Sequence, residues 1–197
     1  MGHSVVDRVE ERRLIQQAQQ GDTDAFAQIY RANVQAVFRY VSYRTSNVQL
    51  AEDLTSEIFT RALEGLPKYQ DRGKPFVAWL YTIAHARIAD HYRKTNRRPD
   101  ESDVEKHQIA VTPDMDENLV RRHAARTLRE AIGLLTEDQQ QVIILRFIEG
   151  ERIETVATIM GKKPNAIKAL QHRALRSLAK HLSRSGVDID SIMAGLS

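Results

Sequence analysis

The sequence predicts an all-α protein made of two small helical domains. Over most of the 197 residues, apolar side chains recur three or four positions apart, which is the period of an amphipathic helix. No segment alternates apolar and polar residues as a half-buried strand would. The stretch at 99–118 breaks the helical period and holds two Pro and seven acidic residues. It predicts an extended acidic linker between the two domains.

Three helices are predicted before residue 66. Between residues 10 and 43 the helical period is broken only by the sequence GDTD, where Asp22 or Thr23 can cap the second helix. A third helix is expected to start near Asn47 and to end at Gly65.

A polar loop at 68–75 precedes a fourth helix, which starts at Pro75 and runs to a basic end. Aromatic residues are interleaved with its Arg and Lys residues. This combination suits single-stranded nucleic acid, because bases stack on the rings while the cations contact phosphates. Phe76 and Trp79 are also residues that commonly fill a core, and Trp79 is expected to pack mostly inside the domain.

The second half of the chain predicts four helices. Periodicity resumes at Leu119, and Thr136 with Gln139 has the form of a capping box ahead of the most apolar segment, 142–148. Two further helices follow within 151–182.

The clearest functional signal lies in that last segment. A short helix ends at Gly161, which can adopt the left-handed conformation, and a longer helix starts at Pro164. Between residues 162 and 184 there are seven Lys or Arg and no Asp or Glu. This pattern predicts a helix-turn-helix DNA reader. A solvated basic face is the plainer interpretation of the charges taken alone.

In a major groove, Lys and Arg donate to guanine edges and Asn pairs with adenine. The candidates for such base contacts are Lys163, Asn165, Lys168 and His172. Phosphate contacts, which set affinity and salt dependence, are expected farther along the helix at Arg173, Arg176 and Lys180.

Composition limits the remaining classes of function. The absence of Cys excludes disulfides and thiolate metal sites, and the seven His show no metal-ligand spacing, so neither a metal nor a cofactor is predicted. No apolar run approaches a membrane span, and the N-terminus has no signal-peptide core, so a soluble cytoplasmic protein is expected. Basic residues outnumber acidic ones by 15 to 11 in 1–98 and by 13 to 8 in 120–197, which suggests nucleic acid at both ends.

Three stretches stand in a recognisable order: AEDLTSEIFTRAL at 51–63, PFVAWLYTIAHARIADHYRK at 75–94, and the segment 135–178. On these residues the chain resembles a bacterial RNA polymerase sigma factor of the sigma-70 family, of the extracytoplasmic-function (ECF) type.

The resemblance implies a division of the chain. It implies a region 2-like domain at 1–98 for polymerase docking and for minus-ten recognition and melting. It implies a region 4-like domain at 119–184 for minus-thirty-five recognition. The linker at 99–118 would thread the polymerase cleft, and the tail at 185–197 has no assigned role.

The resemblance also assigns residues to each contact. For polymerase docking it implies Asp53, Ser56, Glu57 and Arg61. For the minus-ten DNA it implies Tyr69, Arg72, Lys74, Trp79, His85, Arg87, His91, Arg93 and Lys94. For the minus-thirty-five DNA it implies Lys163, Asn165, Lys168, His172, Arg173 and Arg176. Without the resemblance, the carboxylates of 51–63 would be interpreted as a solvated face paired with Arg61 at i+4.

The implied function is that of a dissociable sigma factor. It would bind the clamp helices of the largest subunit and the flap region of core RNA polymerase, recognise both promoter elements and help to open the DNA. An anti-sigma factor is the implied regulator, and no catalysis is required. A stand-alone helix-turn-helix regulator of duplex DNA is the alternative. An enzyme is disfavoured, because no paired-carboxylate site, nucleophile elbow or phosphate loop is present.

Overall fold

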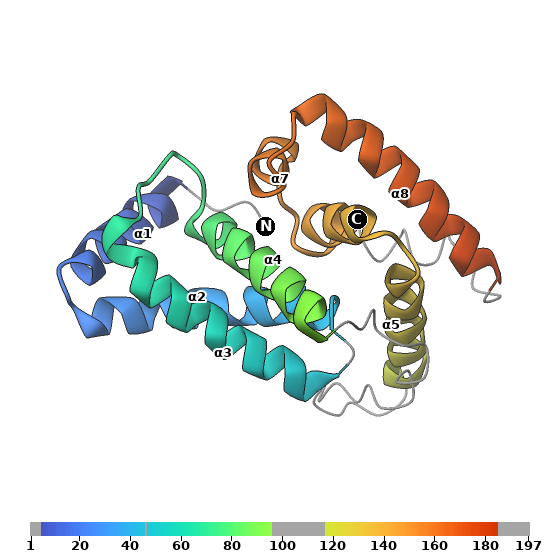
Figure 1. Ribbon diagram of the computed structural model, residues 1–197, viewed down its shortest axis with the longest axis horizontal. Helices are drawn as coiled ribbons and strands as arrows, with labels where there is room; N and C mark the ends of the chain where they lie inside the picture. Colours follow the sequence, from blue (N-terminus) through green and yellow to red (C-terminus); the bar gives the residue numbers. More distant parts are fainter. Residues whose placement is uncertain (1–4, 46, 96–116, 185–197) are drawn as a thin grey trace. The chain divides into compact units, whose positions relative to one another are not determined.

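The computed structural model describes residues 5–45, 47–95 and 117–184, and these ranges are helical with short connections (Figure 1). The α-helices are α1 (Val5–Gln19), α2 (Thr23–Ser42), α3 (Val48–Gly65), α4 (Phe76–Thr95), α5 (Glu117–Gly133), α6 (Glu137–Ile143), α7 (Ile153–Ile159) and α8 (Pro164–Arg184). A 3-10 turn, η1 (Leu66–Lys68), follows α3, and a π-helical turn, η3 (Ile144–Ile148), follows α6. No strand occurs in the described ranges, so the predicted all-α class is confirmed.

Contacts divide the chain into two compact units, of which the first holds α1 to α4 and the second α5 to α8. Helix α5 starts at Glu117, two residues before the expected start of the second domain at 119. The rest of the predicted linker and the predicted tail lie outside the described residues.

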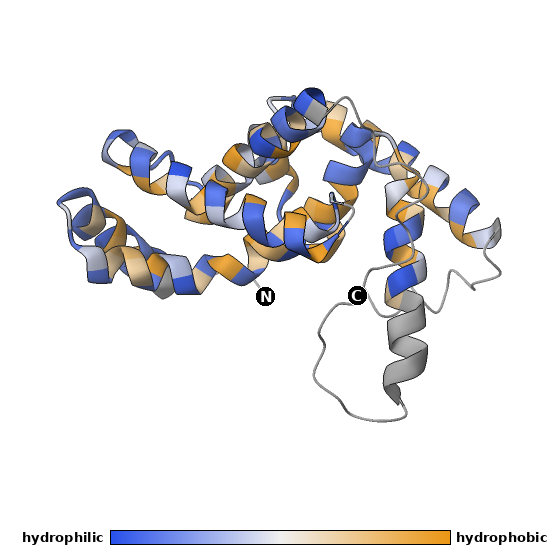
Figure 2. Cartoon of the chain, turned by 60° about the horizontal axis from the view of Figure 1, so that its bottom comes forward, coloured by the Kyte–Doolittle hydropathy of each residue, from blue (hydrophilic) through white to orange (hydrophobic). Residues whose placement is uncertain are grey.

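The first unit forms because each helix buries one apolar side. Figure 2 shows hydrophobic and hydrophilic residues interleaved along the helices, as amphipathic sequences require. Helix α2 packs against both α1 and α4, and the rings of Tyr40 and Tyr81 meet between α2 and α4 at 5.0 Å. Of the two predicted caps, Asp22 is the one used: its Oδ1 accepts hydrogen bonds from the N–H groups of Asp24 and Ala25 at 2.9 and 3.0 Å.

Helix α3 ends at Gly65, as predicted, but not through a left-handed turn. The φ of Gly65 is −84°, and a Cβ atom there would lie 3.2 Å from the Trp79 ring. Gly65 is therefore needed for the close approach of that ring. Phe76 is buried, whereas Trp79 packs on Gly65 and keeps part of its surface exposed. The expectation of a core position is confirmed for Phe76 and only in part for Trp79.

The second unit is built around the contacts of α8 with α5, α6 and α7. The predicted capping box is present at the start of α6, where the Thr136 N–H donates to Gln139 Oε1 at 3.2 Å. The apolar helix expected through residue 148 changes form at Ile144, where i→i+5 bonding replaces the α pattern. The Glu149 N–H donates to the Ile144 carbonyl at 2.9 Å and closes this π turn.

Arg146, within the π turn, joins three parts of the second unit. Its Nε donates to Gln171 Oε1 of α8 at 3.1 Å, and its Nη1 donates to the Glu151 carbonyl in the turn before α7. The guanidinium thereby satisfies the hydrogen-bonding capacity of a loop carbonyl and also binds the side chain of Gln171 on α8.

The helix, turn and helix expected at 153–184 are present. Gly161 has a φ of 62°, and the Lys162 N–H donates back to the Ala157 carbonyl at 2.9 Å, which closes the end of α7. Pro164 is the first residue of α8, as predicted. The buried stripe of α8 is Ile167, Leu170, Ala174, Leu178 and Leu182.

Arg146→Ala should destabilise the second unit by about 1 to 3 kcal/mol, because it removes two charge-assisted hydrogen bonds from a half-buried site. Urea unfolding followed by circular dichroism should show an earlier transition. The fluorescence of Trp79, the single Trp of the chain, should report an unchanged first unit.

Arg152→Ala is the matched control, since Arg152 is an exposed Arg in the same turn and its loss should change stability by less than about 0.5 kcal/mol. Equal shifts for the two variants would show that Arg146 has no special structural role.

Candidate polymerase and DNA interfaces

The outer face of α3 carries three of the four residues predicted to dock on polymerase. Asp53, Ser56 and Arg61 are exposed, and Arg61 forms an ion pair with Glu64 on the same helix at 3.3 Å. Such an exposed i,i+3 pair contributes roughly 0.2–0.5 kcal/mol, so it leaves the Arg61 side chain available to a partner. The i+4 pairing of Glu57 with Arg61 that the plainer interpretation requires does not appear among the ion pairs of the described residues.

Glu57, the fourth of these residues, is joined to α4 instead. Its Oε1 accepts a hydrogen bond from Arg87 Nη2 at 2.5 Å, and Arg87 Nη1 donates to Asp90 at 3.1 Å. The other oxygen of Asp90 lies 3.0 Å from Arg93 Nη1. A predicted polymerase residue and two predicted DNA residues thus share one charge network. With its guanidinium side chain only 19% exposed, Arg87 is the member most enclosed by the protein.

The loop between α3 and α4 brings predicted minus-ten residues together. Tyr69 lies over Phe76 and Trp79, with ring centroids 5.1 and 4.8 Å apart, while Arg72 is exposed and Lys74 half-buried beside them. Burial raises the pKa of Tyr69 to about 12, and the nearby charge of Asp71 acts in the same direction. The phenol therefore stays neutral in the physiological pH range.

Asp71 organises the turn of this loop. Its Oδ1 accepts from the Gly73 N–H at 2.7 Å, and its Oδ2 accepts from Arg12 Nε of α1 at 2.6 Å. Burial alone would raise the pKa of Asp71, but the Gly73 N–H and the Arg12 guanidinium hold it below its usual value. Gly73 has a φ of 75°, which an L residue with a side chain adopts only under strain.

The remaining predicted residues of α4 occupy different surroundings. His85 is half-buried, with its Nδ1 3.5 Å from the guanidinium of the buried Arg44. His91 packs edge-on against Tyr92, whose hydroxyl donates to the Arg44 carbonyl at 2.9 Å. Lys94 is exposed. His85 and His91 are thus both half-buried, and of the predicted residues on α4 only Arg93 and Lys94, at the end of the helix, are exposed.

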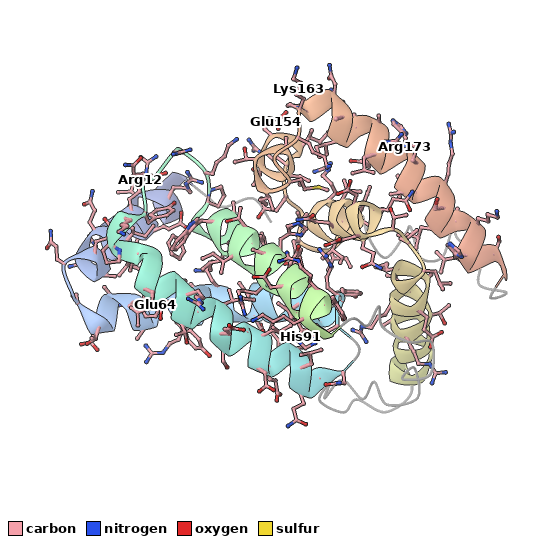
Figure 3. The ribbon with its side chains drawn as sticks, in the orientation of Figure 1. Arg12, Glu64, His91, Glu154, Lys163 and Arg173 are labelled. Atoms are coloured by element: carbon pink, nitrogen blue, oxygen red, sulfur yellow. The ribbon has the colours of Figure 1, made fainter. Side chains whose placement is uncertain are left out.

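Every residue predicted to contact the minus-thirty-five DNA is exposed, Lys163 directly before α8 and the others on it: Lys163, Asn165, Lys168, His172, Arg173 and Arg176. Figure 3 labels two of them, Lys163 and Arg173, whose side chains point away from the unit. The buried stripe described above lies on the other face of the helix. The exposed side of α8 is thus rich in basic residues and carries no acidic one between Pro164 and Arg184.

Some residues that shape these surfaces were not anticipated from the sequence. Arg12 and Gln19 contact the 66–75 loop from α1, and Arg146 orients α8. The contact between Arg12 and Asp71 joins residues 59 positions apart, so the sequence carries no local signal of it.

In the described part of the chain, no group of three or more His, Cys, Asp or Glu residues is placed to hold a metal ion. Nor is any helix there long and apolar enough to cross a membrane.

Comparison with known protein families gives two matches in this chain. Residues 29–98 match Sigma-70 region 2, and residues 125–178 match Sigma-70, region 4. The first match begins within α2 and includes α3 and α4, and the second spans α6 to most of α8.

Curated relatives carry the same assignment. The ECF RNA polymerase sigma factor BldN of Streptomyces coelicolor is 36% identical over 172 residues, which are 86% of this chain and 64% of BldN. The RNA polymerase sigma factor YlaC of Bacillus subtilis is 30% identical over 166 residues, 82% of this chain and 94% of YlaC. The ECF sigma factor SigX of the same organism is 30% identical over 168 residues, 81% of this chain and 84% of SigX.

Solved structures share the fold. CnrH, in complex with the cytosolic domain of CnrY, matches with a TM-score of 0.69 and 24% identity, over 89% of this chain and 98% of that chain. The sigma factor RpoE, in complex with the anti-sigma factor NepR from Bartonella quintana, matches with a TM-score of 0.63 and 25% identity, over 80% of this chain and 96% of that chain.

The chain contains two sigma regions in the expected order, and relatives match it over most of their length. These findings favour a sigma factor over the alternative of a stand-alone helix-turn-helix regulator. The chain belongs to the extracytoplasmic-function RNA polymerase sigma factors of the sigma-70 family.

Proposed function

We propose that this chain is a dissociable promoter-specificity subunit, which binds core RNA polymerase, recognises the minus-thirty-five and minus-ten elements and promotes opening of the DNA. The observation that carries the proposal is the presence of both sigma regions in one chain, with exposed charged faces on α3 and α8. The first domain, 1–98, docks on polymerase and handles the minus-ten element. The second, 119–184, reads the minus-thirty-five element, and the acidic segment 99–118 threads the polymerase cleft.

Polymerase docking falls to α3. Its exposed Asp53, Ser56 and Arg61 face away from the core and have no bond to another helix among the described contacts. Glu57 has a different part in this scheme: its 2.5 Å bond to Arg87 fixes α4 against α3. Docking on the clamp helices of the largest subunit through α3 therefore also sets the position of the DNA-reading helix. In this proposal the second domain binds the flap region of polymerase.

The minus-ten element is read by the loop and by α4. Tyr69, Trp79, Arg72 and Lys74 combine aromatic faces with cations, which is the combination that binds single strands. Unstacking a base costs a few kcal/mol, and contacts to the captured base repay that cost, so opening needs no ATP and no catalysis by this chain. The contact continues along α4 through three half-buried residues and two exposed ones: His85, Arg87, His91, Arg93 and Lys94.

The minus-thirty-five element is read by α8 as duplex DNA. Lys163, Asn165, Lys168 and His172 are near the N-terminal end, where a recognition helix meets base edges. Arg173 and Arg176 follow as phosphate contacts.

An anti-sigma factor is the proposed regulator. RpoE, 25% identical and similar in fold, was solved in complex with the anti-sigma factor NepR, which supports such a partner here. A role on core polymerase places the chain in the cytoplasm.

Asp53→Arg should weaken binding to core RNA polymerase by at least about tenfold, because it places a cation where the docking face offers a carboxylate. Gel filtration and fluorescence anisotropy with core polymerase measure the loss. Asp24→Arg makes the same charge change at an exposed position on α2 and should leave affinity within about twofold. Holoenzyme formation by Asp53→Arg at the wild-type level would remove α3 from the docking surface.

Substitutions on α8 should separate affinity from specificity. Arg176→Ala should weaken binding to all duplexes alike and lower the slope of log affinity against log salt by about 1. Asn165→Ala should instead change the preferred base at particular positions, at a cost of about 1–3 kcal/mol there. Binding selection from a randomised duplex library at two salt concentrations distinguishes the two effects. Uniform weakening by both variants would contradict the division of roles.

A further inference from the structure

Side chains of α1 form hydrogen bonds to the start, the middle and the end of the loop that joins α3 to α4. Gln19 Nε2 donates to the Leu66 and Tyr69 carbonyls at 3.0 and 2.8 Å, at the beginning of the loop. Glu11 Oε1 accepts from the Phe76 N–H at 3.2 Å, at its end. Between them Arg12, which Figure 3 labels, reaches Asp71.

These contacts act on the residues that shape the loop. Asp71 uses one oxygen for Arg12 and the other for the Gly73 N–H, so a single carboxylate links α1 to the left-handed turn. Gln19 fixes the backbone of Tyr69, whose ring packs on Phe76 and Trp79. The backbone from Leu66 to Tyr69 is thus held by two bonds from Gln19, and the Tyr69 ring by its contacts with Phe76 and Trp79.

The neighbouring cation shows that this arrangement is specific. Arg13 has its Nε 2.9 Å from Glu10 Oε2 and remains paired within α1, while Arg12 crosses to the loop. Both Arg side chains are more than half exposed, at 53% for Arg12 and 56% for Arg13. An exposed ion pair contributes little to the stability of a fold. Arg12 therefore has more effect on where the loop lies than on whether the unit folds.

We propose that α1 is a positioning element for DNA capture, in which Arg12 and Gln19 hold the 69–74 loop in the conformation that receives an unstacked base. The inference rests on the proposed role of this loop at the minus-ten element. A loop fixed in advance loses less conformational freedom on binding, so its affinity for the correct base is higher. Arg12 and Gln19 lie outside residues 29–98, which match Sigma-70 region 2. Their hydrogen bonds to the loop therefore come from a part of the chain before that match.

The test uses the full chain and single-stranded DNA of about twelve nucleotides selected from a random pool, a length within the range of known single-strand sites. Affinity is measured for the selected strand and for copies with one base removed at each position. The ratio of the affinity for the intact strand to the affinity for an abasic strand reports base capture. The affinity that all strands share reports phosphate contact.

Arg12→Gln and Gln19→Met should each lower the ratio at the captured position by about three- to tenfold, as expected for the loss of one or two loop contacts. Arg13→Gln, which removes the same charge one residue along, should leave the ratio unchanged. Arg12→Lys keeps a cation opposite Asp71 and leaves the bond from the Gly73 N–H to Asp71 intact, so it should retain most of the ratio.

Each outcome has a distinct meaning. A wild-type chain that prefers no base at any position overturns the proposed capture role and this inference with it. A wild-type preference that survives Arg12→Gln and Gln19→Met overturns the positioning role alone. Equal losses of the ratio for Arg12→Gln and Arg13→Gln would show an effect of charge alone and contradict the inference. A loss for Arg12→Gln in the affinity common to all strands, with the ratio unchanged, would show a direct phosphate contact and also contradict it. Melting temperatures within about 4 °C of wild type would show that the variants remain folded.

Discussion

Burial of one apolar stripe per helix is the constraint on which both units depend. Helix α8 shows it most simply: the side chains of Ile167, Leu170 and Ala174 face the unit, so the basic residues between them are left on the solvent side. At about 25 cal/mol per Å² of buried apolar surface, this stripe outweighs any single charge on the outer face. The basic surface proposed to contact DNA is therefore exposed as a consequence of packing, and the identity of its charged residues is not fixed by the core.

The first unit adds an electrostatic constraint to this packing. Glu57 of α3 bonds to Arg87 of α4 at 2.5 Å, and within α4 Asp90 bonds to Arg87 and Arg93 at 3.1 and 3.0 Å. Two carboxylates hold the half-buried guanidinium of Arg87, which would be costly to leave unpaired. The surface proposed for polymerase and the surface proposed for DNA are consequently joined by the Glu57–Arg87 ion pair within this unit.

How much the sequence could predict depended on the range of the interactions. The caps and turns at Asp22, Gly161 and Pro164 are local, and the structure has them where the sequence predicts them. The all-α class followed from periodicity in the same way. The ion pairs of Arg12 and Arg87 join residues 59 and 30 positions apart, and nothing in the order of residues indicates such partners. The sequence therefore predicted the helices that carry the two proposed surfaces, but it did not predict the bond of Glu57 to Arg87 or that of Arg12 to Asp71.

The π turn at Ile144–Ile148 has a consequence for how this chain can change over generations. The turn is the last of its helix, because Gly150 follows it with a φ of 70° and α7 begins only at Ile153. Arg146 lies inside the turn and bonds both to Gln171 of α8 and to the Glu151 carbonyl. Loss or gain of one residue here would displace at least one of these bonds, so descendants are expected to keep the length of this segment.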